Sequence, residues 1–216
     1  KQTTGTSLKI RSERRFSLRV HLSASISGRN NQDYSAGMTI TKTEIEGLWI
    51  IDPGVFLDSR GYFFETFHDQ RYQLPGAFPF VQDNEAKSDK GVLRGLHFQQ
   101  GEFAQGKLVR VVTGAVYDVA VDLRPDSPTY GMSYGVVLSG ENKRQLWVPR
   151  GFAHGYLVLE DDTIFSYKCD NYYHKPAENG IRYDDPELSI SWPSVDRPLV
   201  VSDKDLSLGS LTGLLL

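Results

Sequence analysis

The sequence predicts an all-β fold, a sandwich or a closed barrel of short strands. Short extended runs recur at roughly 8–12-residue spacing, and turn signals such as Pro53-Gly54 and Ser139-Gly140 separate them. Long helical periodicity is nearly absent, and a chain of 216 residues suits one barrel or sandwich. No apolar run approaches the ~20 residues of a membrane helix, so we expect no membrane partner.

Twelve extended runs make up the predicted core. In chain order they lie within residues 47–52, 61–67, 80–89, 91–99, 107–114, 115–123, 134–140, 145–149, 154–159, 163–169, 180–185 and 190–192. Residues 67–74 and 140–146 are predicted to form at most a turn or two of helix each. The core contains no internal repeat and no low-complexity stretch.

Residues 1–37 differ in composition from the rest of the chain. They hold seven Lys or Arg against two Asp or Glu, are rich in serine, and lack apolar alternation. We therefore expect a flexible leader or extension there, and a single domain over residues 38–216 with Met38 as its start. An organelle-targeting segment is an alternative interpretation of this leader.

The charge and cysteine content narrow the function classes. The net charge is −3 although the leader is basic, so the remaining chain is acidic, which argues against nucleic acid as a partner. The single cysteine, Cys169, excludes an internal disulfide framework and a cysteine-rich zinc site. We expect a reducing compartment, the cytoplasm.

Alternation places two polar side chains at the wall of the predicted barrel. In 163–169, Phe165, Tyr167 and Cys169 share one face, so Tyr167 points inward. In 107–112, Lys107 shares a face with Val109 and Val111, which puts a lysine at the rim of an apolar wall. Taken alone, an inward tyrosine is also compatible with a simple core role, and a rim lysine with a solvated one.

The stretch from Pro149 to His154 has the P-x-G-x-x-H form of the second sequence motif of cupins. The first cupin motif carries a metal-binding H-x-H followed by a carboxylate. The corresponding place here contains His97 without a second histidine, and Glu102 is the only nearby glutamate. Because a transition metal needs three or four such ligands, the motifs predict a cupin-like barrel with a histidine pocket and no metal.

Six ordered motifs together resemble the dTDP-4-dehydrorhamnose 3,5-epimerase family from about residue 45 to residue 207. They are DSRGYFFETF, VQDNEAKSDKGVLRGLHFQ, GKLVRVVTGAVYDVAVDLRPDSPTYG, LSGENKRQLWVPRGFAHGY, SYKCDNYY and VSDKD. The resemblance implies a double-stranded β-helix (jelly roll), a homodimer and no cofactor. It also implies a dTDP-linked 4-keto-6-deoxyhexose as substrate, inverted at both carbons that flank the ketone to give dTDP-4-dehydro-L-rhamnose.

Three other functions remain open on the sequence. One is a relative that epimerises a single carbon or acts on another nucleotide keto-sugar. The second is a metal-dependent cupin, either an oxygenase or a sugar isomerase. The third is a cupin-type binding module without catalysis. Metal analysis tests the second, and deuterium uptake into the ligand tests the third.

Four residue types suit proton transfer next to a ketone. His97 suits the base, because an ordinary histidine is mostly neutral at pH 7. The resemblance assigns the carboxylate that orients its ring to Asp205, with Asp118 as a second candidate. Lys107 is expected to meet the charge on the enolate oxygen, and Tyr167 to return a proton from the opposite face.

The resemblance also implies a set of substrate contacts. Arg94 suits the diphosphate through its bidentate fork. The further expected substrate-binding residues are Arg60, Glu65, Gln82, Asp83, Asn84, Lys107, His154, Tyr173, Glu178 and Lys204, with Arg60 and Glu65 reaching the partner's pocket. Arg94 and His97 would face opposite sides of a regular strand, so we expect a bulge at Gly95.

Overall fold

The computed structural model describes residues 37–214. The predicted leader therefore lies outside the described residues, apart from Gly37. Within the described range, no helix is long and apolar enough to cross a membrane. The predicted domain boundary at Met38 stays a prediction.

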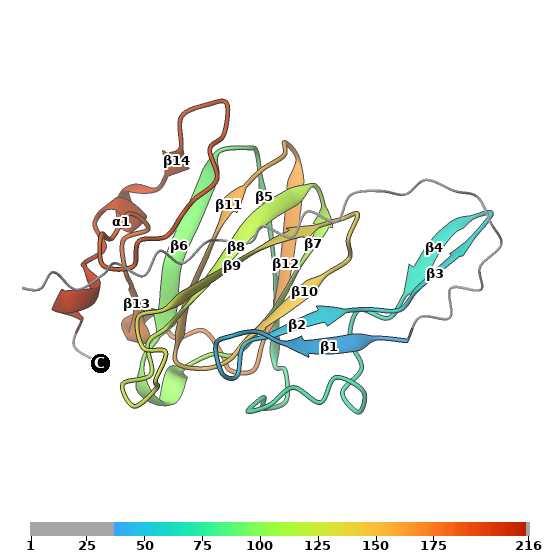
Figure 1. Ribbon diagram of the computed structural model, residues 1–216, viewed down its shortest axis with the longest axis horizontal. Helices are drawn as coiled ribbons and strands as arrows, with labels where there is room; N and C mark the ends of the chain where they lie inside the picture. Colours follow the sequence, from blue (N-terminus) through green and yellow to red (C-terminus); the bar gives the residue numbers. More distant parts are fainter. Residues whose placement is uncertain (1–36, 215–216) are drawn as a thin grey trace, which may run out of the picture. The chain divides into compact units, whose positions relative to one another are not determined.

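Two packed sheets form the body of the described range (Figure 1). Sheet I contains, in spatial order, β1 (Thr39–Lys42), β2 (Trp49–Asp52), β10 (Gln145–Val148), β7 (Lys107–Thr113), β12 (Thr163–Cys169) and β5 (Gln82–Ser88). Sheet II contains β13 (Glu178–Gly180), β6 (Val92–Gln99), β11 (Phe152–Val158), β8 (Ala115–Asp122) and β9 (Ser133–Ser139), and β14 (Val200–Val201) pairs with β6.

The order of the strands along the chain is that of a jelly roll. From β5 to β8 the chain alternates between sheets I and II, and it does so again from β9 to β12. Every pairing is antiparallel except that of β14 with β6. The predicted all-β, double-stranded β-helix fold is thus confirmed, with one short α-helix, α1 (Asp203–Leu206), and the 3₁₀ turns η1 (Gly101–Phe103), η2 (Lys175–Ala177) and η3 (Leu211–Gly213) among the described residues.

The inner faces of the two sheets enclose the main apolar core. Strand alternation sends Val109 and Val111 from sheet I, and Val116 and Ala120 from sheet II, into the same buried cluster. Phe165 joins this cluster, and Tyr167 packs against it from the same face of β12. The predicted inward direction of Tyr167 is confirmed.

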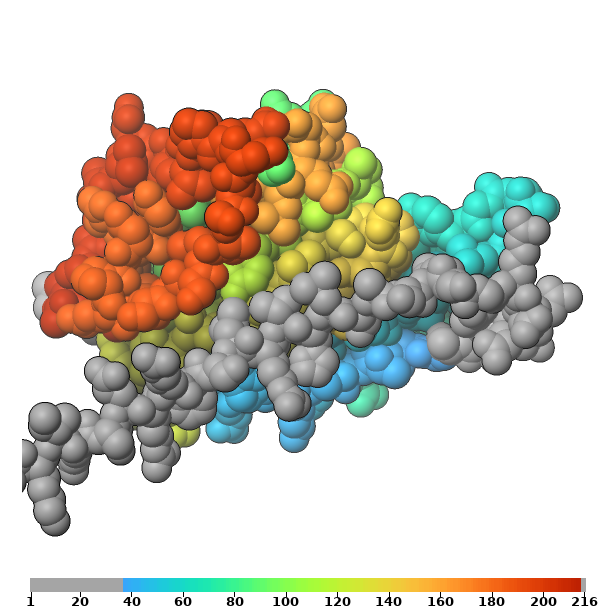
Figure 2. All heavy atoms as spheres, turned by 45° about the horizontal axis from the view of Figure 1, so that its top comes forward, coloured from blue at the N-terminus to red at the C-terminus, as the bar shows by residue number. Residues whose placement is uncertain are grey.

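The outer face of sheet II is covered by the C-terminal part of the chain. Leu96 and Val121 point outward from sheet II and pack under Ile181 and Leu188, with Trp192 at the margin. Figure 2 shows the C-terminal part of the chain, in orange and red, gathered on one side of the molecule. This cover carries α1 to the edge of β6, where its residues reach the inner face.

Two predicted strands in this cover are wrong. Residues 182–185 form turns and residues 190–192 form no strand, although β13 and a single bridge at Ile181 lie just before them. Ile190 and Trp192 are apolar because they pack against sheet II, and not because they alternate within a strand. A short apolar run in the sequence therefore does not distinguish a covering segment from a strand.

The outer face of sheet I is covered by the connection between β4 and β5. Tyr72 and Leu74 from this connection pack on Ile51, Leu108 and Trp147. The residues expected to form short helices, 67–74 and 140–146, form no helix: both contain hydrogen-bonded turns, and Gln145 and Leu146 already belong to β10. This cover leaves the inner face of sheet I free for the site.

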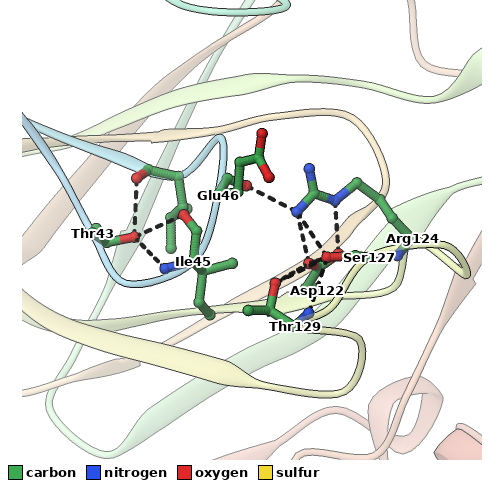
Figure 3. A network of polar contacts seen from close by, with 8 residues as sticks. Thr43, Ile45, Glu46, Asp122, Arg124, Ser127 and Thr129 are labelled. Atoms are coloured by element: carbon green, nitrogen blue, oxygen red, sulfur yellow. Dashed lines mark hydrogen bonds and ion pairs between the residues drawn. The ribbon is translucent and has the colours of Figure 1, made fainter.

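A polar network closes the end of the barrel where β8 meets β9 (Figure 3). Asp122, at the end of β8, accepts hydrogen bonds from Arg124, Ser127 and Thr129 at 2.6–2.8 Å. Arg124 also donates to the carbonyl of Glu46 at 2.8 Å, which ties this turn to the loop before β2. The Asp122 side chain is fully buried, and its neighbours hold its pKa at about 2, against burial, which alone would raise it.

The hairpin of β3 (Val55–Asp58) and β4 (Gly61–Phe64) projects from the body of the fold in Figure 1. It pairs with no other strand among the described residues. Its large apolar side chains are exposed, Leu57 and Phe63 each by 70%. A two-stranded hairpin is marginally stable alone, and these apolar groups have no cover among the described residues.

Candidate active site

A histidine and a carboxylate from distant parts of the chain form the centre of the site. His97 lies on the inner face of β6, and its Nε2 is 2.7 Å from Oδ1 of Asp205 in α1. Asp205 is 3% exposed, and its other oxygen accepts the backbone N–H of Gly95 at 3.2 Å. Because a carboxylate only accepts, Nε2 carries the proton and Nδ1 keeps a free lone pair.

The helix that carries Asp205 is fixed by its own N-cap. The hydroxyl of Ser202, the N-cap residue, accepts the backbone N–H of Asp205 at 3.1 Å, and α1 begins at the next residue, Asp203. Asp205 then points inward while Lys204 stays on the exposed side. Asp118, the second candidate for orienting His97, pairs with His154 instead, at 3.0 Å.

Gly95 allows the two site residues of β6, Arg94 and His97, to face the same side of the sheet. Arg94 lies opposite Tyr156 on β11 and His97 lies opposite His154, with a register shift between the two pairs. Gly95 sits at this shift with φ +126°, and a Cβ there would come 2.5 Å from Gly155 Cα. The expected irregularity at Gly95 is confirmed.

Two polar side chains from sheet I face His97 across the interior. Lys107 lies opposite Cys169 in the pairing of β7 with β12, and Tyr167 lies opposite Val109 in the same ladder. Within residues 37–214, neither the ammonium group of Lys107 nor the hydroxyl of Tyr167 has a hydrogen-bond partner. Polar groups without protein partners inside a barrel are suited to bind a ligand.

Burial and charge set the protonation states of these groups. Burial lowers the pKa of His97 below its usual 6.5 and outweighs the hydrogen bond that His97 donates to Asp205, which raises it. Burial also lowers the pKa of Lys107 and raises that of Tyr167 above 10. At neutral pH the site therefore offers a neutral imidazole and a protonated phenol.

A second cluster lies beside His97 at the end of β6. Glu178 accepts hydrogen bonds from Lys204 at 2.6 Å and from the Tyr173 hydroxyl at 2.9 Å. Burial alone would raise the pKa of Glu178, but these two donors lower it. The backbone N–H of Tyr173 is held by Gln82 of β5 at 2.9 Å.

The remaining residues expected at the site lie on β5 and β6, and one of them, Asp83, faces away from it. Arg94 is exposed and donates to the Ser88 hydroxyl at 3.0 Å. Asn84 shares a face with Gln82 and lies 3.7 Å from the Cys169 sulfur. The side chain of Asp83 lies on the opposite face, in an ion pair with Lys168 at 2.9 Å, so the structure does not bring it to the cluster.

Arg60 and Glu65 also lie away from the His97 cluster within this chain. Arg60 is at the tip of the β3–β4 hairpin, where it pairs with Asp58, and its side chain is 88% exposed. Glu65 follows β4 and pairs with Arg71. The structure describes one chain, and in that chain neither residue reaches the barrel interior.

One residue around the cluster was missed by the sequence analysis. Gln99, two residues after His97 on the same face, donates to the carbonyls of Phe103 and Tyr172 and accepts the N–H of His174 at 2.7 Å. It therefore holds the backbone on both sides of Tyr173. The period of two from His97 was the available signal.

No group of three or more His, Cys, Asp or Glu side chains within residues 37–214 is arranged to hold a metal ion. Glu102, the only glutamate near the first cupin motif, lies exposed in η1. His97 and His154 face each other across β6 and β11, but each is paired with its own aspartate.

Comparison with known proteins agrees with this geometry. Residues 42–212 match the family described as dTDP-4-dehydrorhamnose 3,5-epimerase. The chain is 50% identical to the dTDP-4-dehydrorhamnose 3,5-epimerase of Escherichia coli, over 82% of this chain and 97% of that protein.

Solved structures of epimerases are also similar to this chain. A dTDP-6-deoxy-D-glucose-3,5-epimerase from Legionella pneumophila, in complex with dTDP-4-keto-L-rhamnose, is 50% identical with a TM-score of 0.79, over 82% of this chain and 94% of that one. A 3'-monoepimerase from Streptomyces bikiniensis, in complex with dTDP-quinovose, is 34% identical with a TM-score of 0.74, over 80% and 87%.

Proposed function

Because this chain belongs to the dTDP-4-dehydrorhamnose 3,5-epimerase family and is an isomerase of that activity, we propose that His97, Asp205, Lys107 and Tyr167 carry its reaction. The enzyme converts dTDP-4-dehydro-6-deoxy-D-glucose to dTDP-4-dehydro-L-rhamnose. The observation that carries the assignment is the 2.7 Å contact of His97 with Asp205, facing two unpaired polar groups across the barrel.

The proposed chemistry begins at a carbon next to the ketone. His97 Nδ1 removes its proton, and the electrons of the C–H bond move to the ketone oxygen as an enolate. The imidazolium that forms is stabilised by Asp205. Lys107 donates a hydrogen bond to the enolate oxygen in a desolvated place, where such an interaction is strong.

Inversion needs a proton from the other face. Tyr167 lies on sheet I and His97 on sheet II, so a sugar ring between them has the base on one side and the phenol on the other. The phenol gives its proton to the carbon, and the enolate electrons re-form the ketone. His97 then releases its proton to solvent and Tyr167 takes one up, and the two restored groups act on the second carbon that flanks the ketone.

The nucleotide part of the substrate needs contacts outside this centre. We propose that Arg94 binds the diphosphate, and that Gln82, Asn84, His154, Tyr173, Glu178 and Lys204 bind the sugar and the base. The position of Arg94 on the same face as His97 supports this role. The side chain of Asp83 pairs with Lys168, so we assign Asp83 no side-chain contact with the substrate.

Proton NMR of the reaction in heavy water tests the function. Deuterium at both carbons next to the ketone, with an L-sugar product trapped by reduction, is the expected result. Deuterium and inversion at one carbon only would instead identify a single-carbon epimerase, the second candidate, which the 34% identity to a 3'-monoepimerase keeps open. No deuterium uptake would identify a binding module, and stoichiometric tightly bound metal required for turnover would identify a metal-dependent cupin.

We also propose a homodimer that completes the site. The exposed apolar side chains of the β3–β4 hairpin, Phe56, Leu57, Tyr62 and Phe63, support it, because they need a covering surface. Arg60 at the tip would then reach the pocket of the partner, with Glu65 behind it. The mass in solution by light scattering tests the assembly.

Subunit complementation tests whether the site is shared. His97→Asn and Arg60→Ala chains, each nearly inactive alone, are mixed, unfolded and refolded together. In a heterodimer, one pocket then has an intact His97 and receives an intact Arg60 from the other chain. We expect about one quarter of the wild-type activity from an equal mixture, whereas no recovery would show that Arg60 serves its own chain.

We propose a cytoplasmic location on the basis of the single cysteine. Cys169 is a buried free thiol, and a reducing compartment keeps a thiol in that state. Fractionation of cells that express the full chain tests this location.

A further inference from the structure

Tyr156 is an inward-facing residue of β11 that the mechanism above does not use. It lies two residues after His154 on the same face, and it is 6% exposed. Its ring stacks on Phe165 of the opposite sheet, with centroids 4.1 Å apart and planes inclined by 20°. The side chain therefore bridges the two sheets in the interior of the barrel.

The hydroxyl of Tyr156 has no hydrogen-bond partner within residues 37–214. Among those residues, the enclosed side-chain polar atoms without a partner are Gln145 Oε1 and His174 Nδ1 alone. The Tyr156 hydroxyl is not one of them, so it borders open space rather than packed atoms. A tyrosine buried to this degree usually has a partner for its hydroxyl, so a partner is missing on that side.

The neighbours of Tyr156 indicate which part of a ligand lies there. On one side its strand partner is Arg94 of β6, and on the other it is Asp118 of β8. Phe165 contacts both tyrosines, since its ring stacks on that of Tyr156 and lies 5.9 Å from that of Tyr167. Tyr156 is thus beside the residue proposed to bind the diphosphate, and one ring away from the residue proposed to act on the sugar.

The protonation state of Tyr156 also suits a donor. Burial raises its pKa far above the ordinary value of 10, while the positive charge of Arg94 opposes this rise. The phenol therefore keeps its proton across the working pH range. It can donate to an anionic oxygen that Arg94 also binds.

We propose that the Tyr156 hydroxyl donates a hydrogen bond to an oxygen at the junction of sugar and diphosphate in the bound nucleotide sugar. Tyr156 is then a binding residue that, together with Arg94, sets where the sugar begins relative to His97 and Tyr167. This role rests on the proposed positions of the diphosphate at Arg94 and of the sugar at Tyr167. Tyr156 adds a third polar group without a protein hydrogen-bond partner, from sheet II, to Lys107 and Tyr167 of sheet I.

The test compares Tyr156→Phe with wild type and with Tyr130→Phe, a tyrosine on an exposed turn that loses the same atom. Phe keeps the ring on Phe165, so we expect the melting temperature of Tyr156→Phe to stay close to that of wild type. Its Kd for dTDP by calorimetry, and its KM for the keto-sugar nucleotide, should each rise about 10-fold, the usual effect of one hydrogen bond to a charged oxygen. Its kcat should stay within about two-fold of wild type, since no proton in the reaction passes through it.

Two results would overturn this role. One is a Kd and a KM equal to those of wild type. The other is a fall in kcat at unchanged KM, which would place Tyr156 in the proton transfer and not in binding. A wild-type enzyme that fails to invert the sugar would refute the proposed chemistry, yet a weakened Kd for dTDP in Tyr156→Phe would still support the binding role.

Discussion

Asp205 binds His97 through one carboxylate oxygen, at 2.7 Å, and the backbone N–H of Gly95 through the other, at 3.2 Å. The residue that orients the base thus also holds the strand at the point where its register shifts. The side chain of His97 and the bend of β6 that presents it are fixed by the same group. Loss of the carboxylate should therefore affect both orientation and charge.

The first prediction concerns the pH dependence of Asp205→Asn. In the wild-type enzyme, kcat/KM should rise with pH as His97 loses its proton, with a midpoint below 6.5, since burial lowers its pKa. The charge of Asp205 opposes that shift, so its removal should move the midpoint to still lower pH and reduce the plateau about 100-fold. A pH profile of kcat/KM measures both effects. A midpoint that is unchanged or higher would contradict the proposed pairing.

The second prediction separates proton removal from inversion. Tyr167→Phe keeps the ring beside Phe165, so its stability should change little. It removes the phenol that burial keeps protonated at neutral pH. Solvent deuterium should still enter the carbon next to the ketone, while the yield of inverted sugar falls by about 100-fold. NMR of exchange and reductive trapping of the product measure the two rates. An equal fall in both rates would mean that Tyr167 is not the separate proton donor.

The third prediction concerns Arg94→Ala. The exposed guanidinium donates to Ser88 in the absence of ligand and is free to exchange this neutral partner for a diphosphate. We expect the Kd for dTDP to rise by about 10- to 100-fold, with a smaller loss in kcat. Calorimetry with dTDP measures the change. Arg182→Ala, which removes an arginine paired with Asp184 on the surface, is the control and should bind dTDP normally.

The fourth prediction concerns stability and acid. The pKa of Asp122 is lowered from 3.8 to about 2, so its ionised form favours the folded state. A lowered folded-state pKa gives stability that is complete above the unfolded value and is lost as pH falls from about 4 to about 2. At pH 7 this stability is about 2 kcal/mol.

Asp122→Asn should lose this stability at pH 7 and should show a flatter decline in acid than wild type. Urea unfolding at pH 7, 4 and 3 measures the free energies. Asp196→Asn is the control, because its exposed pair with Lys90 should contribute little. Parallel pH curves for wild type and Asp122→Asn would show that the network in Figure 3 does not act through this charge.

Several parts of the site could be predicted from the sequence because they depend on local geometry. The period of two placed Tyr167 and Phe165 on the inner face of β12, and it showed that Arg94 and His97 need an irregularity at Gly95. Both features are present in the structure. The residue pattern alone contains this information, because strand parity does not depend on the rest of the fold.

Other parts depend on contacts between distant segments. The choice between Asp205 and Asp118 as the partner of His97 required the docking of α1 on β6, which no local pattern predicts. The strands predicted at 180–185 and 190–192 are a covering segment, since burial against sheet II and pairing within a sheet select the same apolar residues. Strand parity puts Gln99 on the same face as His97, but its role depends on the loop residues that it binds, which the sequence does not show.

The separation of His97 and Asp205 by 108 positions in the sequence has a consequence for synthesis on the ribosome. When β12 has emerged, both sheets have nearly all of their strands and the histidine is already on β6. The carboxylate arrives only with α1, after the covering segment that packs on sheet II has been made. A nascent chain that has emerged only through β12 therefore still lacks the group that orients its base.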